Sequence, residues 1–230
     1  MFSIVIPLYN EEKNIIPLLD EIHSVFNNHE QYEIVLINDC STDNTQDVIK
    51  KYKQKRNIKI LNNIYNKGQS YSIYKGITES SHDTIVTIDG DGQNNPNDIP
   101  RLLELYRNQK ERCLVGGLRL KRKDSTLKVF SSVIANNVRS MILNDNCKDT
   151  GCSLKIFSKR DFIRLPYFDG VHRFLPALFK HMGCILLFEE VDHRRREFGY
   201  SKYGTFDRLI KGVRDLFLVF KIIKKIKNNQ

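Results

Sequence analysis

Short apolar runs alternate with helix-like patterns through the first half of the chain. The runs at 2–7, 32–37, 58–61 and 84–88 are rich in Ile and Val, and apolar residues recur at helical spacing at about 13–26, at 45–53 and from Gly68 onward. Buried parallel strands read as continuous apolar runs, and helices connect them. The pattern therefore predicts an α/β fold with a mostly parallel central sheet flanked by helices, and 113–117 is expected to add another strand.

The second half follows a different pattern. Basic residues between 119 and 128 lead into an amphipathic stretch that ends near 143, and a further strand and helix are expected at about 154–163. Residues 205–227 carry apolar side chains at helical spacing opposite Lys and Arg, which predicts one amphipathic helix or a pair. No run approaches the ~20 apolar residues that span a bilayer. The apolar start has no preceding basic segment, so we expect a strand there and no signal peptide.

Polar side chains follow three of the predicted strands, at the point where each strand ends. They are Tyr9-Asn10-Glu11, Asn38-Asp39 and Asp89-Gly90-Asp91. In open α/β sheets, ligands bind outside the carboxyl ends of the strands. The three clusters are therefore expected to line one crevice.

The strongest chemical signal is the pair Asp89 and Asp91. Two carboxylates two residues apart can approach one hard divalent cation, and Mg²⁺ prefers a few carboxylates together with substrate phosphate oxygens. Gly90 and Gly92 allow a tight turn, and Gln93 offers another oxygen. An acidic solvated turn is the alternative, but the position after a fourth parallel strand favours a metal site.

The other two strand ends suggest contacts with a nucleotide. Asp39 is suited to accept an N–H from a nucleobase, whereas residues 41–43 are suited to cap the next helix. The segment 7–11 places Tyr9 where it can lie beside a base, and Glu11 either near a ribose or as a helix cap. Lys67 and Gly68 put a cation and a small residue at a helix N-terminus, where anions bind.

The charge of the chain is concentrated near its C-terminus. Lys and Arg number 37 and Asp and Glu 27, a net charge of +10; residues 194–230 hold 11 basic and 3 acidic residues, or +8, so the other 193 residues carry +2. Nucleic acid, an anionic membrane or an anionic small substrate would each account for this. The five cysteines are scattered without a CxxC, which favours a reducing cytosol over disulfides or zinc.

Taken in order, the motifs of the chain resemble those of family 2 glycosyltransferases with the GT-A fold, and among these the dolichyl- and polyprenyl-phosphate sugar transferases. The motifs are PLYNE at 7–11, NDCSTD at 38–43, NKGQS at 66–70, DGDGQ at 89–93, KDTGCSLK at 148–155, HRFLPAL at 172–178 and HRRREFGYSKYG at 193–204. The resemblance covers essentially the whole chain. It implies a nucleotide-diphospho-sugar transferase domain over 1–203, followed by basic amphipathic helices over 204–230. Residues 1–117 would bind the nucleotide sugar, and 118–203 would form the acceptor half and a basic lid.

The resemblance also implies a role for each candidate site residue. Donor contacts would come from Pro7, Tyr9, Glu11, Asp39, Lys67, Gly68, Asp89 and Gln93. Asp89, Asp91 and Gln93 would hold Mg²⁺ or Mn²⁺ on the donor diphosphate. Catalytic roles would fall to Asp91, Asp149, Arg196 and Lys202, and Arg196, Ser201 and Lys202 would close over phosphates. Acceptor contacts would come from Arg119, Lys123, Lys128, Ser131, Asn136, His172, Arg173 and Ser201, although a buried structural pair is an equal alternative for His172 and Arg173.

The implied reaction is an inverting transfer from a UDP- or GDP-linked sugar to a polyprenyl phosphate. A lipid phosphate is already anionic near neutral pH, so Asp149 would only orient the acceptor. The alternative is a soluble family 2 enzyme that acts on a hydroxyl of a glycan or lipid-linked saccharide, for which Asp149 would be the general base. A third possibility makes Asp149 a turn cap before Thr150-Gly151.

The basic tail predicts an enzyme at the cytoplasmic face of a membrane, bound to an anionic surface or to a membrane-protein partner. Packing of the tail on its own domain or in a homo-oligomer is the alternative. We expect no nucleic-acid partner, because no such motif is present. No GxGxxG follows the first strand, which disfavours an NAD-linked dehydrogenase. The chain has no Trp, whereas the resemblance implies a QxxRW motif in processive polysaccharide synthases.

Overall fold

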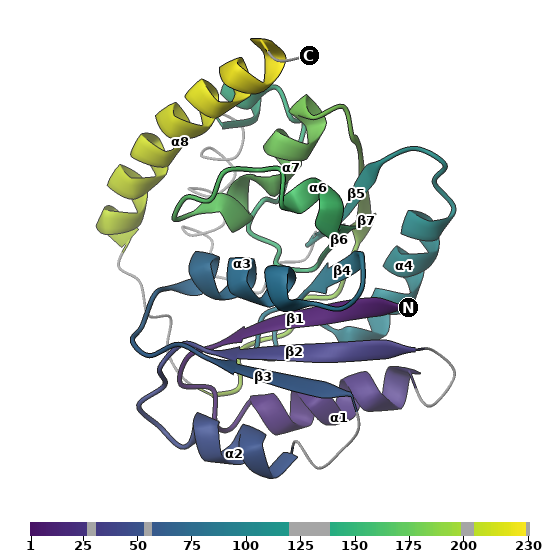
Figure 1. Cartoon of the computed structure of the whole chain (residues 1–230), viewed down its shortest axis with the longest axis vertical. Helices are drawn as coiled ribbons and strands as arrows, with labels where there is room; N and C mark the ends of the chain where they lie inside the picture. The colour runs from purple at the N-terminus through teal and green to yellow at the C-terminus, as the bar shows by residue number, and fades with distance from the viewer. Residues whose placement is uncertain (27–30, 53–56, 120–138, 199–204, 229–230) are drawn as a thin grey trace.

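The central sheet is the framework of the molecule (Figure 1). The computed structural model describes residues 1–26, 31–52, 57–119, 139–198 and 205–228. In these residues seven strands form one sheet in the order β3-β2-β1-β4-β6-β5-β7. The strands are β1 (Phe2–Leu8), β2 (Tyr32–Asn38), β3 (Ile58–Asn62), β4 (Thr84–Thr87), β5 (Cys113–Leu118), β6 (Lys155–Ser158) and β7 (Ile185–Glu190). Only β6 runs antiparallel to its neighbours, so the predicted, mostly parallel sheet is confirmed.

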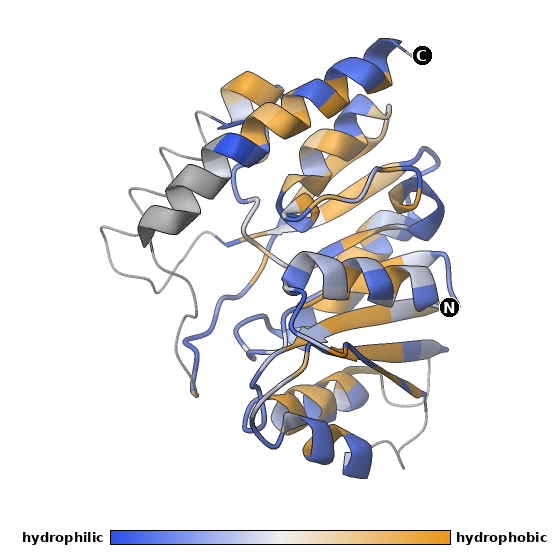
Figure 2. Ribbon diagram, turned by 60° about the vertical axis from the view of Figure 1, so that its left-hand side comes forward, coloured by the Kyte–Doolittle hydropathy of each residue, from blue (hydrophilic) through white to orange (hydrophobic). Residues whose placement is uncertain are grey.

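Helices cover both faces of this sheet. One face packs against α1 (Ile15–Phe26), α2 (Thr45–Tyr52) and α4 (Ile99–Arg107), which follows the short 3₁₀ helix η1 (Pro96–Asp98). The other packs against α3 (Gln69–Glu79), α6 (Lys159–Phe162) and α7 (Val171–His181), and α8 (Thr205–Asn228) packs on α7. Because both faces are covered, β1 is buried along nearly its whole length, and Figure 2 shows hydrophobic strands joined by hydrophilic loops.

The structure differs from the sequence-based expectation in three elements. The strand β7 was not predicted, although it begins with the apolar run 185–188, and the short helix α4 was not predicted either. The apolar residues after His172-Arg173 predict a helix there, but the helix α7 begins earlier, at Val171, so both residues lie in its first turn. The C-terminal segment, predicted to form one amphipathic helix or a pair, is a single helix of 24 residues. None of the described helices has both the length and the apolar character needed to cross a bilayer.

The sheet brings the three polar strand ends together, as predicted. Leu8 at the end of β1 pairs with Asn38 at the end of β2, and the Asp39 N–H donates to the Leu8 carbonyl at 2.8 Å. On the other side of β1, β4 leads directly into the loop that carries Asp89 and Asp91. The carboxyl edge of β2, β1 and β4 is therefore where the candidate site is built.

Candidate functional site

The loop after β4 packs tightly against the end of β1. A Cβ atom on Gly90 would lie 2.4 Å from Leu8 Cδ2 and 3.2 Å from the Pro7 carbonyl oxygen, so only glycine allows this approach. Gly92 adopts φ +73°, a left-handed conformation that other residues rarely take. The glycines therefore place Asp89 and Asp91 in a defined turn.

The two carboxylates interact with each other and with neighbouring elements. Gln69 at the start of α3 donates to Asp89 Oδ1 at 2.7 Å, and the Gln93 N–H donates to Asp91 Oδ1 at 3.2 Å. Burial and then the charge of Asp91 raise the pKa of Asp89 to about 6, and burial also raises the pKa of Asp91. Two half-buried like charges are costly to ionise together, and a divalent cation would remove that cost.

This donor set fits a cation that completes its shell with substrate oxygens. No group of three or more His, Cys, Asp or Glu suited to a metal ion occurs among the described residues. Two carboxylates with an adjacent amide leave most coordination positions to a phosphate-bearing ligand and water, as Mg²⁺ prefers. The residues present therefore match Mg²⁺ or Mn²⁺ bound with a diphosphate better than an all-protein metal cage.

The basic segment 193–198 lies over this loop. Arg196 Nη2 bonds Glu11 Oε1, Arg196 Nη1 lies 3.8 Å from Asp91 Oδ2, and Arg196 Nε donates to the Phe198 carbonyl at 2.8 Å. Glu11 is itself buried and accepts from Asn14 Nδ2 at 2.7 Å. The guanidinium of Arg196 therefore bridges the carboxylates of Glu11, just after β1, and Asp91, in the loop after β4 (the candidate metal loop, hereafter the metal loop).

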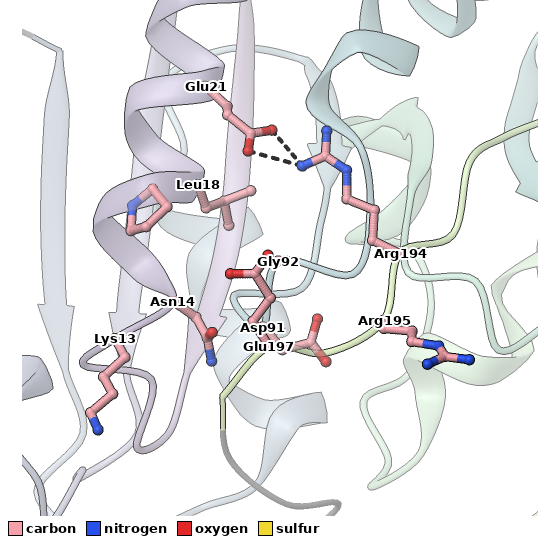
Figure 3. A pocket seen from close by; sticks show the side chains of 10 residues that line it. Lys13, Asn14, Leu18, Glu21, Asp91, Gly92, Arg194, Arg195 and Glu197 are labelled. Carbon is pink, nitrogen blue, oxygen red and sulfur yellow. Dashed lines mark hydrogen bonds and ion pairs between the residues drawn. The ribbon is translucent and has the colours of Figure 1, made fainter. Parts of the chain in front are cut away.

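Arg194 anchors the same segment on α1. Its Nη1 donates to both Glu21 oxygens at 2.9 and 2.8 Å, and its N–H donates to the Gln93 carbonyl at 2.8 Å. Figure 3 shows this pair above a cavity of about 60 Å³ that Asp91 and Gly92 also line. Gln93 Nε2 in turn donates to the Arg194 carbonyl at 3.3 Å. The basic segment and the metal loop are thus held together through Gln93.

Asp39 joins the end of β2 to the loop before α3. Its Oδ1 accepts from Asn63 Nδ2 at 2.7 Å and from the Lys67 N–H at 2.9 Å, and its Oδ2 accepts from the Gly68 N–H at 2.7 Å. The anion at this helix N-terminus is therefore the chain's own carboxylate. The Lys67 ammonium lies over the Tyr65 and Tyr71 rings, 4.8 and 4.1 Å from their centroids. Contacts of Asp39 with a base and of Lys67 with a phosphate stay predictions.

Asp149 forms a two-pronged ion pair with Arg119. Arg119 Nε lies 2.7 Å from Asp149 Oδ2, and Arg119 Nη2 lies 2.8 Å from Asp149 Oδ1, with both side chains buried. A Cβ on Gly151 would come within 2.9 Å of Arg119 Nη2, so the glycine of the KDTG sequence makes room for the guanidinium. Burial by itself lowers the pKa of Arg119, but the hydrogen bonds and charge of Asp149, together with the charge of Asp89, outweigh burial and raise that pKa. Asp149 is thus held as the counter-ion of an arginine.

The structure brings most of the predicted residues to one edge, but not all of them meet there. Pro7 is the next-to-last residue of β1, and Tyr9 follows its last residue, Leu8. His172 and Arg173 contact Ser70 of α3 and Asp215 of α8, respectively. Six predicted residues lie outside the described part of the chain: Lys123, Lys128, Ser131, Asn136, Ser201 and Lys202.

Sequence reasoning missed the residues that support the site. Gln69 and Ser153 hold Asp89, since the Asp89 N–H donates to Ser153 Oγ at 3.2 Å. Both residues lie inside the motifs NKGQS and KDTGCSLK, and membership in these motifs was the signal that could have identified them. Lys155 is buried and donates to the carbonyls of Cys152 and Thr150, and no local sequence pattern predicts that it binds backbone in the core.

Two curated relatives match nearly the whole chain. A dodecaprenyl-phosphate galacturonate synthase from Rhizobium johnstonii is 34% identical over 94% of this chain and 65% of its own length. An undecaprenyl-phosphate 4-deoxy-4-formamido-L-arabinose transferase from Edwardsiella ictaluri is 30% identical over 93% of this chain and 66% of its own length. The chain thus spans just under two thirds of each relative.

Solved structures show the same fold. A glucosyl-3-phosphoglycerate synthase from Mycobacterium tuberculosis, crystallised with Mn²⁺, UDP and phosphoglyceric acid, superposes with a TM-score of 0.71 at 18% identity, over 94% of this chain and 76% of that one. The crystal structure of the same enzyme with Mg²⁺ and UDP superposes with a TM-score of 0.71 at 17% identity, over 94% of this chain and 76% of that one. This likeness confirms the predicted GT-A fold. The model of glycosyl transferase family 2 matches residues 3–165, and the chain belongs to that family.

Proposed function

We propose that this protein transfers a sugar from a nucleoside diphosphate to a polyprenyl phosphate. The observation that carries the choice of acceptor is the Asp149–Arg119 ion pair. A carboxylate bound at both oxygens by a buried guanidinium is a poor general base. It would become neutral on accepting a proton, and the buried charge of Arg119 would then have no counter-ion. A phosphate acceptor needs no base, whereas a hydroxyl acceptor does. The two curated relatives, named for dodecaprenyl- and undecaprenyl-phosphate products, support the same acceptor class.

The donor would lie across the carboxyl ends of β1, β2 and β4. Asp89, Asp91 and Gln93 would hold Mg²⁺ or Mn²⁺ on the diphosphate, where the cation lowers the cost of charge on the leaving group. Tyr9, Glu11 and Asp39 surround the position expected for the nucleoside. The Mycobacterium tuberculosis enzyme, crystallised with UDP and Mn²⁺ or Mg²⁺, supports a uridine nucleotide and a divalent cation at this edge. We assign 1–117 to donor binding and 118–203 to the acceptor half.

The chain's own residues would act mainly by electrostatic stabilisation. Arg196, which bridges Glu11 and Asp91 in this structure, would move onto the diphosphate as negative charge grows there. Lys202, in the same sequence motif at 193–204, would act with it. Donors preorganised for such charge are worth about 10²–10³ in rate each. Arg119, held by Asp149, would face the acceptor phosphate, and Lys123, Lys128, Ser131 and Asn136 extend the acceptor surface in our assignment.

We place the protein at the cytoplasmic face of a membrane, without a spanning helix of its own in the described residues. The α8 side chains Phe217 and Phe220 are 68% and 51% exposed, and exposed Arg214, Lys221 and Lys224 surround them. Aromatic rings among basic residues suit the interface of an anionic bilayer. An anionic surface, or a membrane-protein partner with similar chemistry, would bring α8 to the lipid acceptor.

A thermal-shift panel of UDP- and GDP-linked sugars, each with and without Mn²⁺, tests the donor half of the proposal. A bound donor should raise the melting temperature by mass action, and the rise should require the metal. Transfer of labelled sugar from the responding donor to undecaprenyl phosphate, with a glycan hydroxyl acceptor in parallel, tests the acceptor. A protein that responds to no nucleotide sugar, or that labels only the hydroxyl acceptor, would contradict the proposal.

A further inference from the structure

The C-terminal helix α8 is attached to the start of α7 through a buried charge. Asp215 is 6% exposed, and its Oδ2 lies 2.6 Å from Arg173 Nη2. Gly170, the N-cap of α7, has φ +109°, and a Cβ there would lie 2.7 Å from the same Asp215 oxygen. The carboxylate therefore sits against the N-terminal end of α7, where the helix dipole favours a negative charge.

The start of α7 is in turn bonded to the start of α3. Ser70 Oγ accepts the Gly170 N–H at 2.7 Å and lies 2.7 Å from His172 Nδ1, and Ser70 is almost fully buried. The residue before it, Gln69, donates to Asp89 Oδ1 at 2.7 Å. Polar contacts, together with residues adjacent in the chain, thus link α8 through the N-terminal ends of α7 and α3 to the proposed metal loop.

Packing of α8 does not require this ion pair. Val219 and Ile223 on the same helix are buried in the apolar layer shared with α7, and they supply the hydrophobic part of the contact. Buried ion pairs contribute little net stability, because removing two charges from water offsets most of their attraction. Arg173 Nε is also buried with no hydrogen-bond partner among the described residues, a further cost of keeping Arg173 in this position.

We propose that Asp215 and Arg173 are positioning residues, which hold the N-termini of α7 and α3 so that Gln69 keeps Asp89 in its metal-binding orientation. The inference rests on the proposed function for its effect on the donor. In this proposal Arg173 connects α7 to α8, whereas the resemblance implied a contact with the acceptor. It also makes the geometry of the donor site depend on α8, the helix that carries the exposed Phe217 and Phe220.

The test compares Asp215→Asn with a matched control, Asp161→Asn. Asp161 is an equally buried carboxylate that pairs with Arg112 at 2.7 Å, at the amino-terminal side of β5 and away from the metal loop. We expect Asp215→Asn to weaken binding of Mn²⁺–UDP and raise the donor KM by about tenfold, the effect of one lost charge-assisted hydrogen bond. The fold-change in kcat should be smaller than the fold-change in donor KM. Asp161→Asn should lower the melting temperature but leave the donor KM unchanged.

Hydrogen exchange of the full-length chain without ligand separates this inference from the proposed function. Asp215→Asn should speed exchange at 68–72 and 170–174, and Asp161→Asn should not. Faster exchange confined to α8 would overturn the positioning role, even if the wild-type protein binds no nucleotide. In a double-mutant cycle, Ser70→Ala should cost less donor affinity in the Asp215→Asn background than alone; additive losses would also contradict the proposal.

Discussion

At the scale of single residues, partners decide what a carboxylate does. Asp149 and Asp89 both lie in polar motifs, but Asp149 is neutralised by a guanidinium, whereas Asp89 faces another carboxylate. The first is suited to hold a cationic side chain in place, and the second is suited to receive a cation. These two environments support the different roles that we propose for the two residues.

Substitution of Asp149 distinguishes the two acceptor classes. Asp149→Asn keeps the shape of the side chain and one of its bonds to Arg119, so transfer to a lipid phosphate should fall by about tenfold, the cost of one charge-assisted bond. A hydroxyl acceptor would lose its base, and turnover would be abolished. Initial rates with undecaprenyl phosphate measure the effect, and Arg119→Lys, which removes the two-pronged geometry, should give a loss of similar size.

Gly90 is the residue on which the packing of the metal loop depends. In Gly90→Ala the new methyl group would overlap Leu8 Cδ2, and overpacking of this kind costs about 1–3 kcal/mol. Urea denaturation of the variant should show that loss in the free energy of unfolding, with weaker binding of Mn²⁺. Gly212→Ala is the control: its Cβ meets no atom within 4 Å inside α8, so it should be neutral or stabilising by up to ~1 kcal/mol. Equal effects of the two substitutions would contradict the packing argument.

At the scale of elements, α8 has two distinct sides. Its buried side, with Asp215, Val219 and Ile223, packs on α7, and its exposed side carries Phe217 and Phe220 among basic residues. Figure 2 shows the two kinds of residue mixed along the ribbon of this helix. Packing within the described residues therefore accounts for the buried side of this helix, and the exposed rings are the ones that we propose to contact a membrane surface.

Replacement of the exposed rings tests that partner. The double variant Phe217→Ser, Phe220→Ser should bind vesicles of anionic lipid at least several-fold more weakly in co-sedimentation, because burial of an aromatic side chain contributes about 1.5–3 kcal/mol. Folding should be preserved, since both side chains are exposed. Ile163→Ser, at a 51% exposed residue away from α8, serves as the control. Wild-type protein that stays in the supernatant at low salt would rule out direct lipid binding.

At the scale of the whole molecule, side-chain bonds tie successive β-α units to each other. Glu33 on β2 accepts from Ser3 Oγ of β1 at 2.6 Å and from Ser81 Oγ, before β4, at 3.0 Å. Burial alone would raise its pKa, but the bonds from Ser3 and Ser81 outweigh burial, and the pKa of Glu33 lies below its ordinary value of 4.5. The carboxylate therefore stabilises the native sheet in its ionised form.

This bond predicts a pH dependence of stability. Because the pKa is lower in the folded chain, the contribution of Glu33 is present above pH 4.5 and is lost as the pH falls through the folded value. Glu33→Gln should lower the free energy of unfolding by ~1 kcal/mol or less at neutral pH, since the group is half-exposed. The difference from wild type should shrink below pH 4.5. A difference that is independent of pH would show that the charge has no part in it.

The sequence by itself determined the order of strands and helices through β4 and the edge at which the site lies. Continuous Ile- and Val-rich runs specify buried parallel strands, and the topology of such strands places their polar ends together. The motifs also identified the family, and they predict a metal-binding role for Asp89, Asp91 and Gln93 that stays a prediction. These are local signals, each readable within a few residues.

The tertiary structure alone decided which side chains become partners. The pairs Arg119–Asp149, Arg196–Glu11 and Arg173–Asp215 join residues 30, 185 and 42 positions apart. The insertion of β6 between β4 and β5 likewise joins distant segments. Such contacts leave no periodicity in the chain, because a charge is equally compatible with a solvated surface and with a buried pair. The fold buries these charges beside one another, and their burial and pairing create the candidate site.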